Sequence, residues 1–125
     1  MMIAAILESG ELERLYTGLS LLVSAAADGR PARGLVSFGA LGPMLDRDLA
    51  ARAAGADVPG GETFARSLVE LRETARELDD CRLWACAAAV ELTGASAAEI
   101  EARLDGVMST PRFLREVAGA DLVVV

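Results

Sequence analysis

The sequence contains no histidine, lysine, asparagine or glutamine, and all twelve of its basic residues are arginine. Without histidine, the chain has no imidazole for a general base, a Ser-His-Asp triad or a metal site. Without lysine, it has neither a Schiff-base amine nor a P-loop lysine. The side chains that remain for chemistry are those of cysteine, serine, threonine, the acidic residues, arginine and one tyrosine. Of these, only cysteine is a good nucleophile without a dedicated base.

Aromatic residues are also scarce, at 4%, although hydrophobic residues make up 53% of the 125 residues. This length corresponds to one ordinary domain, covering residues 1–125, with an aliphatic and alanine-rich core. So high an apolar fraction exceeds what one small core can hide, so we expect a homo-oligomer. The net charge is -7, and an acidic chain does not attract phosphate backbones, so we expect no nucleic-acid partner.

No apolar run is long enough for a membrane span, so we expect no membrane association. The apolar start, residues 1–7, follows no basic segment, precedes Glu8 and is too short for a secretory signal. We interpret it as the first strand and expect a cytoplasmic protein. Two cysteines in a reducing compartment need not form a disulfide.

Strands and helices alternate along the chain. The sequence predicts strands over residues 2–7, 32–38, around 83–86, 104–108 and 121–125, and helices over 11–27, 44–54, 62–79, 87–92, from 97 and over 110–117. Ser9 is the predicted N-cap of the first helix. Apolar strands buried on both faces indicate an α/β protein, a three-layer α/β/α sandwich with a five-stranded, mainly parallel sheet, flavodoxin-like in outline.

Right-handed crossovers place every strand-to-helix join of such a sheet at one edge, where ligands bind. A cleft at this edge is therefore predicted. Its candidate pocket residues come from the joins and from the helix after Cys86: Ser9, Gly10, Phe38, Gly39, Ala88, Ala89, Met108 and Ser109.

Cys86 is the candidate catalytic residue. It lies where a strand around Leu83 and Trp84 turns into a helix, beside N–H groups whose partial positive charge favours a thiolate. The alternative is a small buried hydrophobic residue, a common role of free cysteine. Cys81 lies five residues earlier, so on one strand the two side chains face opposite sides, roughly 16 Å apart and beyond disulfide reach. We interpret Cys81 as structural.

The segment LWACAAAVELTG resembles the DsrE/DsrF-like family, in which a strand ends in a cysteine and runs into a helix closed by glycine. The opening ESGELERLYTGLSLLVSAAADG and the closing PRFLREVAGADLVVV resemble that family's first and last segments. The resemblance implies a small α/β/α sandwich assembled as a trimer or hexamer. It also implies a sulfur carrier or sulfurtransferase that relays a persulfide between partner proteins, and only Cys86 carries over residue by residue.

Our hypothesis is that Cys86 accepts sulfane sulfur, that the amides of Ala88 and Ala89 hold the persulfide, and that no cofactor takes part. Arg47 or Arg52 could attract an anionic donor such as thiosulfate. The candidates for the apolar surroundings of the sulfur are Phe38, Met44, Trp84 and Met108.

Two alternatives stay open at this point: a non-catalytic assembly subunit with an inert cysteine, and a thiol peroxidase that acts through a sulfenic acid. No G-x-G-x-x-G loop follows the first strand, which gives no support to a nucleotide-binding protein.

Overall fold

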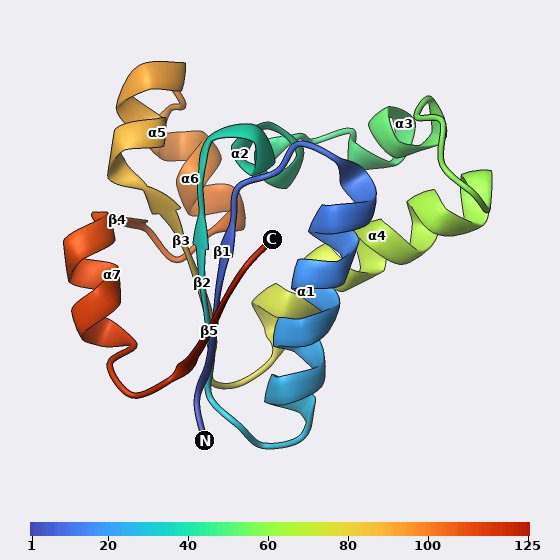
Figure 1. The fold of residues 1–125 in the computed structure, drawn as a ribbon. Coiled ribbons are helices and arrows are strands. Elements are labelled where there is room, and N and C mark those ends of the chain that lie inside the picture. The colour runs from blue at the N-terminus through green and yellow to red at the C-terminus, as the bar shows by residue number, and fades with distance from the viewer.

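Five strands form one fully parallel sheet (Figure 1). The computed structural model describes all 125 residues. The strands lie in the order β4-β3-β2-β1-β5 and comprise Ile3–Leu7 (β1), Ala32–Val36 (β2), Cys81–Cys86 (β3), Val107–Met108 (β4) and Asp121–Val124 (β5). The predicted fold class, α/β with a parallel five-stranded sheet between helical layers, is confirmed.

The two helical layers are unequal. The helices are Leu12–Ala27 (α1), Phe38–Leu45 (α2), Leu49–Ala54 (α3), Gly61–Glu77 (α4), Ala87–Thr93 (α5), Ala97–Arg103 (α6) and Thr110–Glu116 (α7). The chain steps from β1 to β4 in one direction, so right-handed crossovers put α1, α4 and α6 on one face. Only the return from β4 to β5 crosses the other face, which it covers with the short helix α7 (Figure 1).

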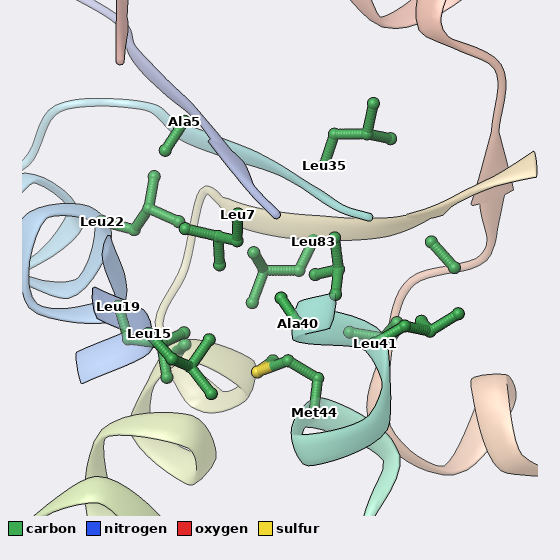
Figure 2. Packing of buried hydrophobic residues seen from close by; sticks show 14 of the residues in the cluster. Ala5, Leu7, Leu15, Leu19, Leu22, Leu35, Ala40, Leu41, Met44 and Leu83 are labelled. Atoms are coloured by element: carbon green, nitrogen blue, oxygen red, sulfur yellow. The ribbon is translucent and has the colours of Figure 1, made fainter. Parts of the chain in front are cut away.

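The larger part of the core lies between the sheet and α1. Figure 2 shows Leu15, Leu19 and Leu22 of α1 directed toward strand side chains such as Leu83. Gly34 of β2 makes this packing possible, because a Cβ there would come within 2.3 Å of the Leu83 side chain. Each buried leucine contributes about 2 kcal/mol relative to an exposed one.

On the opposite face the packing is built around one aromatic pair. Phe113 of α7 is fully buried and meets Trp84 of β3 edge-on, with 6.3 Å between the ring centroids. This contact places α7 over β3 and orients the first turn of α7 toward the carboxyl end of that strand.

Several predicted boundaries are wrong. Strand β2 ends at Val36 rather than at residue 38, because Phe38 takes a left-handed conformation (φ 30°) and begins α2. The helix predicted over residues 44–54 is divided between α2 and α3. The carboxylate of Asp46 accepts a hydrogen bond from the amide of Asp48 (2.8 Å), and Asp48 in turn caps α3, so these two residues end one helix and start the next.

The predicted cap of the first helix is also wrong. Helix α1 begins at Leu12, and its N-cap position is Glu11 rather than Ser9. The helix predicted from residue 97 is confirmed as α6, which Ser96 and Glu99 start with a capping box. None of the helices combines the length and the hydrophobicity needed to cross a membrane.

A buried arginine attaches α4 to the carboxyl end of α2. The guanidinium of Arg72 donates hydrogen bonds to the carbonyl oxygens of Pro43 (3.0 Å) and Asp46 (2.6 Å). A cation is favoured there because the last carbonyls of a helix carry partial negative charge. Burial lowers the pKa of Arg72 from its ordinary value. The contact fixes α2, whose first turn follows Ser37 at the edge that carries the candidate site.

Candidate functional site

Cys86 is the last residue of β3 and the residue from which α5 begins. Its backbone is extended (φ -64°, ψ 124°), and the helix starts at Ala87. Gly94 ends the helix in the left-handed conformation (φ 73°). The predicted strand-to-helix join is therefore confirmed, and the parallel sheet puts it at the carboxyl edge, where α/β proteins bind ligands.

The register of the sheet brings two hydroxyl groups to Cys86. On one side, β2 ends at Val36, which leaves Ser37 level with Cys86. On the other side, Met108 of β4 pairs with Cys86, and Thr110 begins α7 shortly afterwards. The residues that follow the two neighbouring strands thus flank the thiol.

Burial and the polar groups near this sulfur act on the pKa of its thiol in opposite directions. Burial alone would raise the pKa of the Cys86 thiol. Hydrogen bonds from the amide of Ala89, the hydroxyl of Ser37, the amide of Ala88 and the hydroxyl of Thr110 outweigh burial, so the pKa lies below that of an ordinary cysteine. The two amides belong to the first turn of α5, where N–H groups have no partner within the helix. The site therefore favours a thiolate.

The sulfur lies just beneath the surface. Cys86 is 4% exposed and Ser37 is buried, whereas Ala88 and Thr110 are exposed residues with small side chains. Cys86 itself belongs to the buried residues of the hydrophobic core, and the half-buried Ala87 and the exposed Ala88 follow it directly on α5.

The two hydroxyls that the sequence assigned to the pocket have local partners instead. Ser9 accepts a hydrogen bond from the amide of Glu11 (3.1 Å). Ser109 caps α7 and accepts from the amide of Arg112 (3.4 Å). Both therefore stabilise the starts of helices.

Ser37 and Thr110 are not among the residues predicted to surround the thiol. Ser37 lies inside the strand predicted to reach residue 38, and Thr110 belongs to the helix predicted over residues 110–117. The available signal was a hydroxyl-bearing residue directly after a strand that neighbours the cysteine strand. Using that signal requires the order of the strands, which the sequence does not state.

Two predicted glycines bring separate loops into contact at the same edge. A Cβ on Gly39 would lie 2.7 Å from the amide nitrogen of Gly10 and 2.9 Å from the carbonyl oxygen of Glu8. The backbone after β1 thus packs directly on the first turn of α2. The absence of side chains at Gly10 and Gly39 allows the two backbone segments to lie in direct contact.

We expect Gly39→Ala to lower the free energy of unfolding by about 2 kcal/mol, because backbone atoms cannot move aside as a flexible side chain can. Gly42→Ala is the matched control in the same helix, since a Cβ there would meet only the Arg52 guanidinium at 3.8 Å. That control should be neutral or slightly stabilising. Denaturant titration measures both, and equal losses in the two variants would contradict the role of the close contact.

A cavity of about 830 Å³ opens beside this edge, between the α2–α3 and the α5–α6 connections. Of the predicted pocket residues, Phe38 and Gly39 line it, and Cys86 does not. Ser37 and Phe38 are consecutive, so one backbone segment borders the sulfur and the cavity. The remaining predicted wall residue of α2, Met44, is fully buried near the leucines of α1 (Figure 2).

Both arginines proposed for anion attraction line the cavity. The Nε atom of Arg52 pairs with the carboxylate of Asp46 (2.7 Å), and this bond holds the pKa of Asp46 below its usual range. Arg47 is exposed and makes no ion pair. The carboxylates of Asp46, Asp48 and Glu99 line the same cavity, so Arg47 has acidic neighbours although it forms no ion pair with them.

Phe38 is the most unusual residue of the cavity wall. Its side chain is 50% exposed although it is aromatic, and its backbone has φ 30°. A bulky residue in this region of conformational space is strained, and such strain gathers at functional sites. This strained residue lines the cavity and directly follows Ser37, which is level with Cys86 in the sheet.

Cys81 occupies the opposite end of β3, and both cysteines are free. It is 2% exposed and shares a face of the sheet with Leu83, whereas Cys86 shares the other face with Trp84. Burial, with a smaller contribution from Asp105, raises the pKa of the Cys81 thiol to about 11. Cys81 is therefore protonated at neutral pH.

No group of three histidine, cysteine or acidic residues is arranged to hold a metal ion. A scan against protein-family models found none that matches this chain, and a search of curated proteins found no similar sequence. The case for a function therefore depends on the geometry around Cys86.

Proposed function

We propose that the protein is a sulfur carrier, a sulfurtransferase-like protein that holds sulfane sulfur as a persulfide on Cys86 and passes it to a partner thiol. The observation that carries this proposal is the position of Cys86 at the carboxyl end of β3, at the start of α5 and between the residues that follow β2 and β4, where nearby amides and hydroxyls lower the pKa of its thiol. Such a position stabilises negative charge on sulfur, which both the attacking thiolate and the persulfide anion require.

Loading begins when the Cys86 thiolate attacks the outer sulfur of a donor such as thiosulfate. A new sulfur–sulfur bond forms on Cys86, the sulfur–sulfur bond of the donor breaks, and sulfite leaves with the electron pair. The negative charge that was on the thiolate is then on the terminal sulfur of the persulfide. The amides of Ala88 and Ala89 at the start of α5 hold this charge.

Unloading follows the same chemistry. A thiolate of the partner attacks the terminal sulfur, the bond between that sulfur and Cys86 breaks, and Cys86 regains its thiolate. The sulfane sulfur leaves as the partner's persulfide, so no external oxidant or reductant is needed. Thiol–disulfide exchange proceeds by the same kind of attack.

The cavity supports the choice of an anionic donor. Arg47 forms no ion pair, which leaves its guanidinium free to donate to a small anion in a cavity that carboxylates also line. Phe38 lines this cavity and directly follows Ser37, which is level with Cys86 in the sheet.

The resemblance to the DsrE/DsrF-like family agrees with this proposal. A five-stranded parallel sheet with a cysteine at the end of β3 is what that resemblance implies for the fold. We extend the proposal to membership of this family and to a homo-oligomer of the size that the resemblance implies.

The proposal predicts that incubation with thiosulfate or a polysulfide adds about 32 Da, the mass of one sulfur atom, to the intact protein. Cys86→Ser should remain unmodified, and a small thiol should strip the added sulfur from the wild type. Cys81→Ala is the matched control and should be modified like the wild type, because the Cys81 thiol is buried and protonated. Intact-protein mass spectrometry measures the added mass in the wild type and in both variants. An unmodified wild type, or the same gain in Cys86→Ser, would rule out the proposal.

A further inference from the structure

Strand β5 is an edge strand that no helix covers. It lies at the end of the sheet, and β1 is the one element with which it makes substantial contact. Helix α7 packs on Trp84 of β3, which lies next to the opposite edge strand, β4. Leu122 and Val124 of β5 are consequently 43% and 57% exposed.

The backbone of β5 has one satisfied side and one free side. The amides of Asp121 and Val125 donate to the carbonyl oxygens of Met2 (3.3 Å) and Ile6 (2.8 Å). Because the groups of successive strand residues point to alternate sides, the N–H and C=O groups of Leu122 and Val124 point away from the sheet. These free groups belong to the two exposed apolar residues.

The two edges of the sheet differ in how they are protected. At the other edge, β4 is only two residues long, and short edge strands are a common protection against unwanted pairing. Residues 122–125 of β5 are Leu-Val-Val-Val, with no charge and no proline. A bare apolar edge of this kind is a template for another strand.

We infer that β5 pairs antiparallel with β5 of a second copy of this chain, around a two-fold axis at Val123. In this register Leu122 lies opposite Val124 of the partner subunit, and both residues have outward N–H and C=O groups. Each such pair exchanges two hydrogen bonds, and the axis generates two pairs.

The outward backbone groups of β5 are complementary to those of β5 in a second copy of the chain. Each outward amide hydrogen, which is positive, meets an outward carbonyl oxygen, which is negative, and none of the four groups of either chain is left over. The side chains fit as well, because opposed residues share a face. Leu122 and Val124 of both copies then cover one another beside Ile6, which pairs with Val124 in the sheet and is only partly buried.

This contact is independent of the sulfur chemistry. Pairing across the two-fold axis joins the two sheets into one, with the carboxyl edges of the two copies pointing in opposite directions. Each Cys86 therefore stays at its own end of the assembly, away from the interface. A two-fold contact of this kind can occur within a hexamer but not within a trimer alone.

The test is sedimentation velocity of the full chain over a range of concentrations, with Val124→Pro as the disrupting variant. Proline at residue 124 removes an outward N–H and leaves the bonds to β1 intact. We expect the wild type to have at least twice the 13.0 kDa chain mass, and Val124→Pro to weaken the association about 100-fold. Val107→Arg changes an exposed residue of the β4 edge and should behave like the wild type.

Hydrogen exchange of the Leu122 and Val124 amides identifies the surface used. Both amides should be protected in the wild type and should exchange rapidly in a Leu122→Arg variant, while the amides of β1 stay protected in both and report an intact fold. A monomeric wild type, or an oligomer in which these two amides exchange freely, would overturn the inference. Loading of Cys86 with sulfur should be equal in the wild type and the monomeric variant, so failure of the dimer and failure of the sulfur carrier are separate results.

Discussion

Replacing Ser37 with alanine should shift the thiol–thiolate equilibrium of Cys86 about tenfold toward the thiol, because a hydrogen bond to a charged group is worth about 1.5 kcal/mol. Thr110→Val removes the second hydroxyl and should have a similar effect, and the double variant should approach a 100-fold shift. The physical reason is that both hydroxyls lower the pKa of the thiol against burial, which raises it. At neutral pH the loading of sulfur should fall as the thiolate fraction falls.

The titration is followed by the ultraviolet absorbance of the thiolate in a Cys81→Ala background, so that one thiol is observed. Ser9→Ala is the matched control, since its hydroxyl binds the amide of Glu11 and should leave the titration unchanged. If Ser37→Ala, Thr110→Val and Ser9→Ala all titrate like the parent, the donors do not act on the sulfur. In that case the alternative of an inert cysteine in a non-catalytic assembly subunit is favoured.

The fold was largely predictable because local signals agree with each other along the chain. The join at Cys86 follows from an apolar strand, a run of alanines and the glycine at residue 94, each of which favours the structure observed. The capping box at Ser96 and the start of α7 at Ser109 follow from side-chain hydrogen bonds to nearby amides. These features need no knowledge of distant residues.

The surroundings of the sulfur were less predictable because they depend on contacts between distant segments. Ser37 reaches Cys86 only because β2 and β3 are neighbours in register, and strand order is not encoded in local patterns. The end of β2 was misplaced because Phe38 adopts a left-handed backbone that its residue type disfavours. An alternation of strands and helices also could not show that one face of the sheet carries only α7.

The fold raises the pKa of the second cysteine, Cys81, whereas it lowers the pKa of Cys86. Burial raises the pKa of Cys81 to about 11, so the folded protein keeps this thiol neutral at a pH where the unfolded chain has already ionised it. Above the pKa of the unfolded thiol, about 8.5, folding therefore binds a proton, and stability falls as the pH rises toward 11. Wild-type protein should lose about 2 to 3 kcal/mol of unfolding free energy over this range from Cys81 alone.

Denaturant titrations of the wild type, Cys81→Ala and Cys86→Ala between about pH 5 and pH 11 cover both effects, because the effect of Cys81 lies above about pH 8.5 and that of Cys86 lies below it. The wild-type curve should fall more steeply by the amount stated. Cys86→Ala should differ from the wild type in the other direction. The lowered pKa of Cys86 stabilises the fold above the pKa of the unfolded thiol, and this stability is lost as the pH falls through the folded pKa. Parallel curves for all three proteins would mean that the two ends of β3 do not differ, whereas opposite deviations would show that one strand holds an inert thiol and an ionised one.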